Sequence, residues 1–69
     1  DINACVDKEG NTALHIAAVY AEGDFHIVKL LLANKASLKI KNLFEYTPIQ
    51  EARLHKNYEM VRYLISQQI

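Results

Sequence analysis

The sequence predicts an all-α repeat solenoid, in which antiparallel helix pairs stack on one another and are joined by hairpin-like loops. One observation behind this prediction is that TALHIA at positions 12–17 returns as TPIQEA at 47–52, 35 residues later. Another is that IVKLLL at 27–32 returns as MVRYLI at 60–65, 33 residues later. Repetition at this period is typical of a stacked array. Because the two offsets differ by two, we place two extra residues of the first copy within 19–24.

The first helix is expected from residue 13 to 19 or 20. Thr12 precedes it, and threonine is a favoured N-cap residue. Leu14, Ala17 and Ala18 have the i, i+3, i+4 spacing of one buried face.

The second helix is expected over 25–33, with Asp24 as its N-cap. Its predicted inner stripe consists of Val28, Leu31 and Leu32.

The second helix pair begins at Thr47-Pro48, since proline is favoured at the first helical position. This third helix is expected to end at residue 54 or 55. The fourth is expected from 58 to about 67, capped by Asn57. Its predicted buried stripe consists of Val61, Leu64 and Ile65.

Two polar segments join these helices. Residues 7–10 (DKEG) form a predicted turn, in which Gly10 permits a positive φ. Residues 34–46 show no helical period, and a loop of this length is usually functional or a hairpin-like extension. Apolar residues at Leu38, Ile40, Leu43 and Phe44 predict short extended segments around a turn.

Composition excludes several classes of function. The net charge is zero, with −3 in residues 1–34 and +3 in residues 35–69, so neither half is a strong nucleic-acid footprint. We interpret the basic cluster at 35–41 as a solvated loop. No apolar run approaches ~18 residues, so no membrane insertion is expected. Cys5 is the only cysteine, which excludes an internal disulfide and favours an intracellular location, cytoplasmic or nuclear.

The motif at 12–18, followed by 27–32, resembles the ankyrin repeat, and 47–52 with 60–65 resembles it again. Residues 1–4 (DINA) are similar to the tail of a preceding unit. The resemblance divides the chain into that tail (1–6), a first repeat (7–41) and a second repeat (42–69). Because about three units are usually needed for stability, we expect the chain to be a segment of a longer array.

Departures from the family pattern carry their own predictions. Glu45 and Lys35 stand where the family uses glycine, which is unfavourable if the backbone there needs a positive φ. Glu51 and Arg53 replace a usual leucine and alanine. Charges are costly between stacked repeats, so we expect both to lie on a water-facing outer side. The second repeat would then be a C-terminal capping repeat.

No catalytic or metal-binding constellation is visible, so no enzyme activity and no cofactor are expected. His15 stands where the resemblance implies a structural histidine that bonds near Thr12 and bridges loops. Gln50 replaces it in the second repeat, which argues against catalysis. The other histidines, His26 and His55, have no metal-ligand spacing to Cys5.

The function implied by the resemblance is binding of another protein through the loop tips and the exposed face of the first helix of each repeat. The corresponding residues are Lys8, Glu9, Asn11, Val19 and Tyr20 in the first repeat, and Leu43, Phe44, Tyr46, Leu54 and His55 in the second. Several are large and apolar, as interface anchors are. In the alternative interpretation, Leu43 and Phe44 fold back and pack the long loop. Two other functions stay open: a purely structural cap, and a regulatory segment of a larger enzyme or channel.

Overall fold

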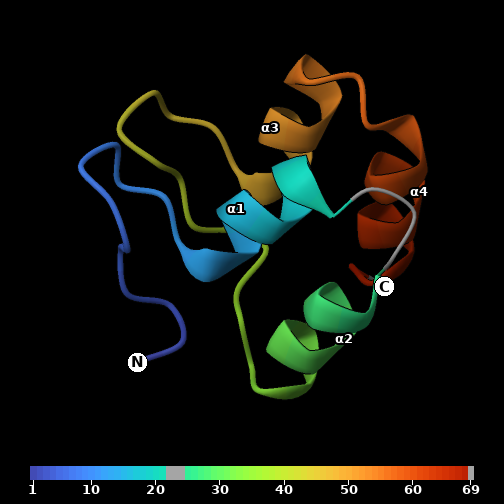
Figure 1. Ribbon diagram of the computed structural model, residues 1–69, viewed down its shortest axis with the longest axis horizontal. Helices are drawn as coiled ribbons and strands as arrows, with labels where there is room; N and C mark the ends of the chain where they lie inside the picture. The colour runs from blue at the N-terminus through green and yellow to red at the C-terminus, as the bar shows by residue number, and fades with distance from the viewer. Residues whose placement is uncertain (22–24, 69) are drawn as a thin grey trace.

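The computed structural model describes residues 1–21 and 25–68. Within these residues, a helix forms in each of the four segments where the sequence predicts one, and no β-strand forms (Figure 1). They are α1 (Ala13–Tyr20), α2 (His26–Ala33), α3 (Pro48–Leu54) and α4 (Tyr58–Ser66). The bounds agree with the sequence-based ones to within one residue, and the all-α repeat fold is confirmed. The proposed N-cap Asp24 lies outside the described residues, as does half of the segment 19–24 that holds the insertion.

The helices form two layers. One layer consists of α1 and α3, which pack against each other. The other consists of α2, which packs on α1, and α4, which packs on α3. The connecting loops extend from α1 and α3 in the direction away from α4 (Figure 1). The loops and the inner helices therefore share one face of the molecule.

Helices α1 and α3 begin in the same way, which explains why their first residues repeat in the sequence. Thr12 Oγ1 accepts a hydrogen bond from the His15 backbone N–H, and His15 Nδ1 accepts one from the Thr12 N–H. In α3, Thr47 Oγ1 accepts from the Gln50 N–H, and Gln50 Oε1 accepts from the Thr47 N–H. These reciprocal pairs are capping boxes, which satisfy backbone donors that the helix leaves unpaired. Histidine and glutamine are interchangeable here because each supplies an acceptor at the third position.

His15 also joins the two repeats. Because Nδ1 accepts from Thr12, the ring proton lies on Nε2, which donates to the carbonyl oxygen of Tyr46 at 2.8 Å. His15 is buried and both of its ring nitrogens are used. The structural role expected for this histidine is therefore what the structure shows.

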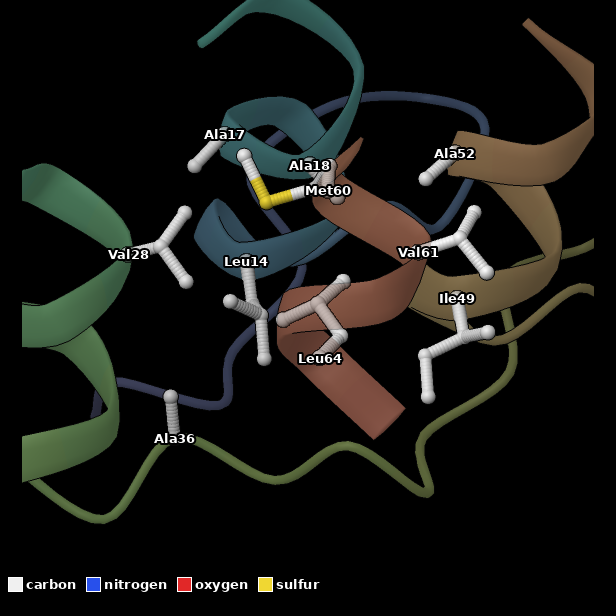
Figure 2. Packing of buried hydrophobic residues seen from close by; sticks show 10 residues of the cluster. All are labelled: Leu14, Ala17, Ala18, Val28, Ala36, Ile49, Ala52, Met60, Val61 and Leu64. Atoms are coloured by element: carbon white, nitrogen blue, oxygen red, sulfur yellow. The ribbon is translucent and has the colours of Figure 1, made fainter. Parts of the chain in front are cut away.

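The core is shared by both helix pairs (Figure 2). Figure 2 shows the buried apolar side chains directed into the space between the helices; they are Leu14, Ala17, Ala18, Val28, Ala36, Ile49, Ala52, Met60, Val61 and Leu64. Of its four alanines, Ala17 and Ala18 lie in α1 and Ala52 lies in α3, and these small side chains allow the two helices to approach closely. Phe25 and Tyr63 stack their rings 4.9 Å apart beside this cluster and so connect the segment before α2 to α4.

The predicted stripe of α1 is confirmed, but that of α4 is wrong by one position. Met60, Val61 and Leu64 are buried, whereas Ile65 is 44% exposed. The predicted and the observed stripes both have helical spacing, and the packing of α4 on α3 buries the one that includes Met60. In α2 only Val28 is fully buried, while Leu31 and Leu32 are half-buried at the edge of the core.

The expectation that Glu51 faces water is also wrong. Glu51 is only 9% exposed and lies on the side of α3 that meets the first repeat. Its burial is tolerated because Asn42 Nδ2 donates a short hydrogen bond to Glu51 Oε2. Arg53 is exposed, as expected.

Within the described part of the chain, three residues other than glycine adopt positive φ: Lys35 (70°), Glu45 (65°) and Lys56 (62°). The first two are the positions where glycine was expected from the family pattern. The structure thus keeps the left-handed backbone conformation although the side chain is unfavourable there.

Candidate partner-binding surface

Two neighbouring turns form the tip of the loop face. The first turn, residues 6–11, is closed by a 2.7 Å hydrogen bond from the Val6 N–H to the Asn11 carbonyl. The second turn, residues 42–46, is closed by a bond from the Asn42 N–H to the Tyr46 carbonyl at 3.0 Å. The Leu43 N–H then donates to the Glu9 carbonyl at 2.9 Å, which fixes one turn beside the other.

Gly10 makes this close approach possible. It is buried, has φ +77°, and a Cβ added there would lie 3.1 Å from both Leu43 N and Leu43 Cγ. A side chain at this position would meet both backbone strain and a steric contact with the second turn. Glycine is therefore required at this position for two reasons: the backbone conformation and the lack of room for a side chain.

Asn42 is the polar centre of the surface. Its Nδ2 donates to Asn11 Oδ1 of the first turn and to Glu51 Oε2 of α3. Its Oδ1 accepts from the backbone N–H groups of Phe44 and Tyr46 in its own turn. One buried side chain therefore holds both turns and α3 in a fixed relation.

Asp7 organises the first turn by itself. Its Oδ1 accepts from the backbone N–H groups of Glu9 and Asn11, and its Oδ2 accepts from Asn11 Nδ2, all at 3.0 Å. The Asn11 side-chain bond, followed by the two backbone bonds, lowers the pKa of this carboxyl from its usual value. Asp7 is thus held in its charged form.

Behind the turns lies a hollow of about 270 Å³, which we call the polar hollow. It runs between the first turn, α1 and α3. Its lining consists of Asp7, Glu9, Asn11, His15, Ile16, Val19, Tyr20, Glu51 and His55. His55 Nε2 lies 3.6 Å from Glu51 Oε1, one helical turn away, and forms an ion pair when the imidazole is protonated.

The structure brings together half of the residues predicted for partner binding. Five line the polar hollow: Glu9, Asn11, Val19, Tyr20 and His55. The other five lie around it: Lys8, Leu43, Phe44 and Leu54 are exposed, and Tyr46 is half-buried, with its carbonyl held by His15. Leu43 is 73% exposed and Phe44 is 58% exposed. The interpretation in which these two fold back and pack the loop is therefore wrong.

Four residues that line the hollow do not belong to the predicted set: Asp7, His15, Ile16 and Glu51. Glu51 could have been found from its sequence signal, a charge in an apolar position of the repeat, had the correct side of α3 been assigned. Asp7 carries only the ordinary signal of a turn residue.

A second hollow, of about 410 Å³, lies between α1 and α2 and is almost wholly apolar; we call it the apolar hollow. Its lining consists of Val6, Ala13, Ile16, Ala17, Tyr20, Ala21, Ile27 and Leu31. Val6 and Ile27 are largely exposed there. An exposed apolar area of this kind marks a site of contact.

Within residues 1–21 and 25–68, no three side chains of the metal-ligating types gather into a cluster. In the same part of the chain, no helix has the length and apolar character needed to cross a membrane.

The comparisons with known proteins define the class. A family model described as ankyrin repeats, in three copies, matches residues 1–69. The chain therefore belongs to the ankyrin-repeat family, whose members are generally non-catalytic modules that bind other proteins.

Among curated proteins, the chain is similar to inversin of Canis lupus familiaris, with 37% identity over 65 residues, 94% of this chain and 6% of inversin. It is 36% identical over 59 residues to ankyrin repeat domain-containing protein 13C of Homo sapiens, 86% of this chain and 10% of that protein. A putative ankyrin repeat protein of Rickettsia felis shares 38% identity over 47 residues, 64% of this chain and 21% of the relative. The chain thus spans a small part of the length of the relatives it matches.

Proposed function

We propose that this chain binds a partner protein through the two turns and the exposed sides of α1 and α3. The observation that carries this proposal is the exposure of large apolar side chains around the polar hollow. Leu43 and Phe44 project from the tip of the second turn, although its backbone is fixed by Asn42. Tyr20 and Leu54 are exposed at the ends of α1 and α3. Apolar and aromatic anchors on a fixed scaffold, with polar groups around them, are typical of protein interfaces.

The segment is further proposed to belong to a longer array, with repeats at 7–41 and 42–69 after the tail 1–6. The apolar hollow supports this, because stacking of another helix pair on α1 and α2 would cover it. An intracellular location is part of the same proposal, and the single cysteine, Cys5, agrees with it.

The alternative is a structural capping repeat that binds no partner. Two exposed polar residues on α3, Gln50 and Arg53, favour it, since a cap presents a polar side to water. Burial of Glu51 removes one of the arguments for it.

The experiment starts from partners captured by proximity labelling in cells, each of which is then purified. Isothermal titration calorimetry compares the unmodified chain with a double variant, Leu43→Ala and Phe44→Ala. We expect a loss of affinity of at least about tenfold, because truncation of an interface anchor costs about 2 kcal/mol or more. The matched control is Leu30→Ala, an exposed leucine of α2 on the opposite layer, which should leave affinity unchanged. Unchanged affinity of the double variant, together with a lower stability, would support the capping function instead.

A further inference from the structure

The two repeats place corresponding residues of their outer helices in different surroundings. Met60 and Leu64 of α4 are fully buried in the core that is shared with the first repeat (Figure 2). The residues 33 positions earlier are Ile27 and Leu31 of α2. Ile27 is 58% exposed, Leu31 is half-buried, and both line the apolar hollow. The apolar hollow is thus the side of the first repeat that corresponds to the contact side of the second.

The inner helices show the same correspondence at a distance of 35 positions. Glu51 and Ala52 are buried where α3 meets the first repeat. Their counterparts in α1, Ile16 and Ala17, line the apolar hollow. Ile16 replaces a charged side chain with an apolar one, so this side of the first repeat is the more apolar of the two. A helix pair that packs on it gains from the burial of apolar surface.

The first turn adjoins the apolar hollow and has an unused backbone donor. In the second turn, the Leu43 N–H donates to the Glu9 carbonyl and so joins that turn to the first repeat. The counterpart of Leu43 is Lys8, whose N–H donates to none of the described residues. The first turn therefore offers a donor at the position where the second turn uses one to contact its neighbour.

The same turn has an acceptor with spare capacity. The Tyr46 carbonyl accepts the bond that closes its own turn and a second bond from His15 Nε2 of the first repeat. The counterpart of Tyr46 is Asn11. Among the described residues, the Asn11 carbonyl accepts the closing bond from the Val6 N–H alone. Since a carbonyl oxygen has two lone pairs, it can accept a further bond on this side.

One substitution makes the two turns chemically different. Asn42 Nδ2 donates to Asn11 Oδ1 across the contact between the turns. Its counterpart in the first turn is Asp7, which is held in its charged form and can only accept. Asp7 Oδ2 accepts a single bond among the described residues, from Asn11 Nδ2, and has room for another. A neighbouring turn must therefore present a donor to Asp7, where Asn11 presents an acceptor to Asn42.

We propose that the apolar hollow and the first turn together receive a further helix pair of the same repeat type, whose turn carries a lysine or arginine at the position of Asn11. The occupant follows from continuity, because these are the positions through which the first and second repeats already join. The basic side chain donates to Asp7 Oδ2. The third residue of the first helix of this pair donates to the Asn11 carbonyl, and a carbonyl of its turn accepts from the Lys8 N–H. This rests on the longer array of the proposed function and adds the chemistry that selects the unit at this place.

The first experiment measures whether such a unit covers the hollow. An extended chain consists of residues 1–41 followed by residues 7–69, with Asn11→Lys in the added repeat. Leu31→Ala is made in the repeat next to the second one, and in the 69-residue chain for comparison. We expect its shift of the urea midpoint to be at least about twofold larger in the extended chain, because the side chain is fully buried there. Leu30→Ala is the matched control, since Leu30 does not line the hollow and should shift both midpoints equally. Equal shifts for Leu31→Ala would overturn the proposal.

The second experiment isolates the basic contact. Four extended chains combine Asn11 or Asn11→Lys in the added repeat with Asp7 or Asp7→Asn in the next one. Such a cycle cancels what each change does to its own turn. We expect the effect of Asn11→Lys on the urea midpoint to be more favourable by roughly 0.5 M opposite Asp7 than opposite Asp7→Asn. The reason is that an asparagine at position 7 can donate to Asn11, as Asn42 does. An equal effect in both backgrounds would rule the contact out.

The two experiments separate this inference from the proposed function. A covered hollow without a preference for lysine would remove the basic contact and leave the longer array supported. An uncovered hollow would remove the array together with this inference. Partner binding by Leu43 and Phe44 is measured in a different assay and does not depend on either result.

Discussion

The side-chain amide of Asn57 donates a 3.0 Å hydrogen bond to the carbonyl oxygen of Ala18, in the last turn of α1. Asn57 precedes α4, where a capping role was expected, yet its side chain makes no hydrogen bond to its own helix. It instead satisfies one of the carbonyls that the end of α1 leaves unpaired. The residue that precedes the second helix of one pair thus completes the first helix of the other.

Replacement of Asn57 should therefore weaken the contact between repeats. Asn57→Ala removes the donor to the buried Ala18, and we expect a loss of about 1–2 kcal/mol of unfolding free energy, measured by urea denaturation. Asn34→Ala is the control, since Asn34 also donates to a helix carbonyl, Leu30, but at an exposed position. An equal effect of the two variants would contradict the special role of Asn57.

Gly10→Ala and Glu45→Gly should change the free energy of unfolding in opposite directions. Gly10→Ala places a Cβ 3.1 Å from Leu43 in a backbone with positive φ, so we expect destabilisation of about 1–3 kcal/mol. Glu45→Gly relieves the same backbone strain at φ 65° and should raise the unfolding free energy by roughly 0.5–1 kcal/mol. Thermal unfolding followed by circular dichroism measures both. A stabilising Gly10→Ala would mean that the two turns are not in contact.

The same reasoning applies at the end of α3. Lys56 has φ 62° directly after the helix and its cap, where glycine is the preferred residue. Lys56→Gly should stabilise the chain by about 1 kcal/mol. Lys39→Gly, at an exposed loop position without positive φ, is the control and should not stabilise it.

Leu31 and Leu64 occupy equivalent positions in the two repeats, but their replacement should affect stability differently. Leu64 is fully buried, so Leu64→Ala should cost about 2–5 kcal/mol. Leu31 is half-buried and lines the apolar hollow, so Leu31→Ala should cost clearly less. Urea denaturation compares the two variants, and a larger loss for Leu31→Ala would show that the apolar hollow is covered in solution.

Asp7 makes stability depend on pH. Because its folded pKa is below the ordinary value of 3.8, the charged form stabilises the fold above that pH. This contribution is lost as the pH falls below 3.8 through the lower folded pKa. Asp7→Asn should therefore be less stable than the unmodified chain at neutral pH, and its stability should vary less with pH in the acid range. Parallel denaturation curves from pH 2 to 7 check this, and identical pH profiles of the two proteins would refute it.

The sequence predicted the helices well, because their start signals are local. Thr12 and Thr47 are each followed, three residues later, by a side chain that accepts a hydrogen bond from the threonine backbone N–H. Such a start signal involves only a few neighbouring residues. The buried faces depend on packing as well. Val61-Leu64-Ile65 and Met60-Val61-Leu64 are both helical stripes, and only contact with α3 distinguishes them.

The candidate site was harder to predict for a related reason. A charged residue was expected to avoid the space between repeats, but the burial of Glu51 depends on Asn42, nine positions earlier in the chain. Spacing along the sequence does not show that these two side chains meet. The exposed residues of the turns were easier, since no stacking contact requires Leu43 or Phe44 to be apolar.

The bonds of Asn42 have a consequence for the thermodynamics of recognition. Since one side chain holds both turns, neither can be rearranged without breaking its bonds to the other. A ligand that touches both turns meets a surface already in its final shape, and little entropy remains to be lost there on association. Selectivity at this face should then depend on which ligands fit, rather than on how far the loops adapt to them.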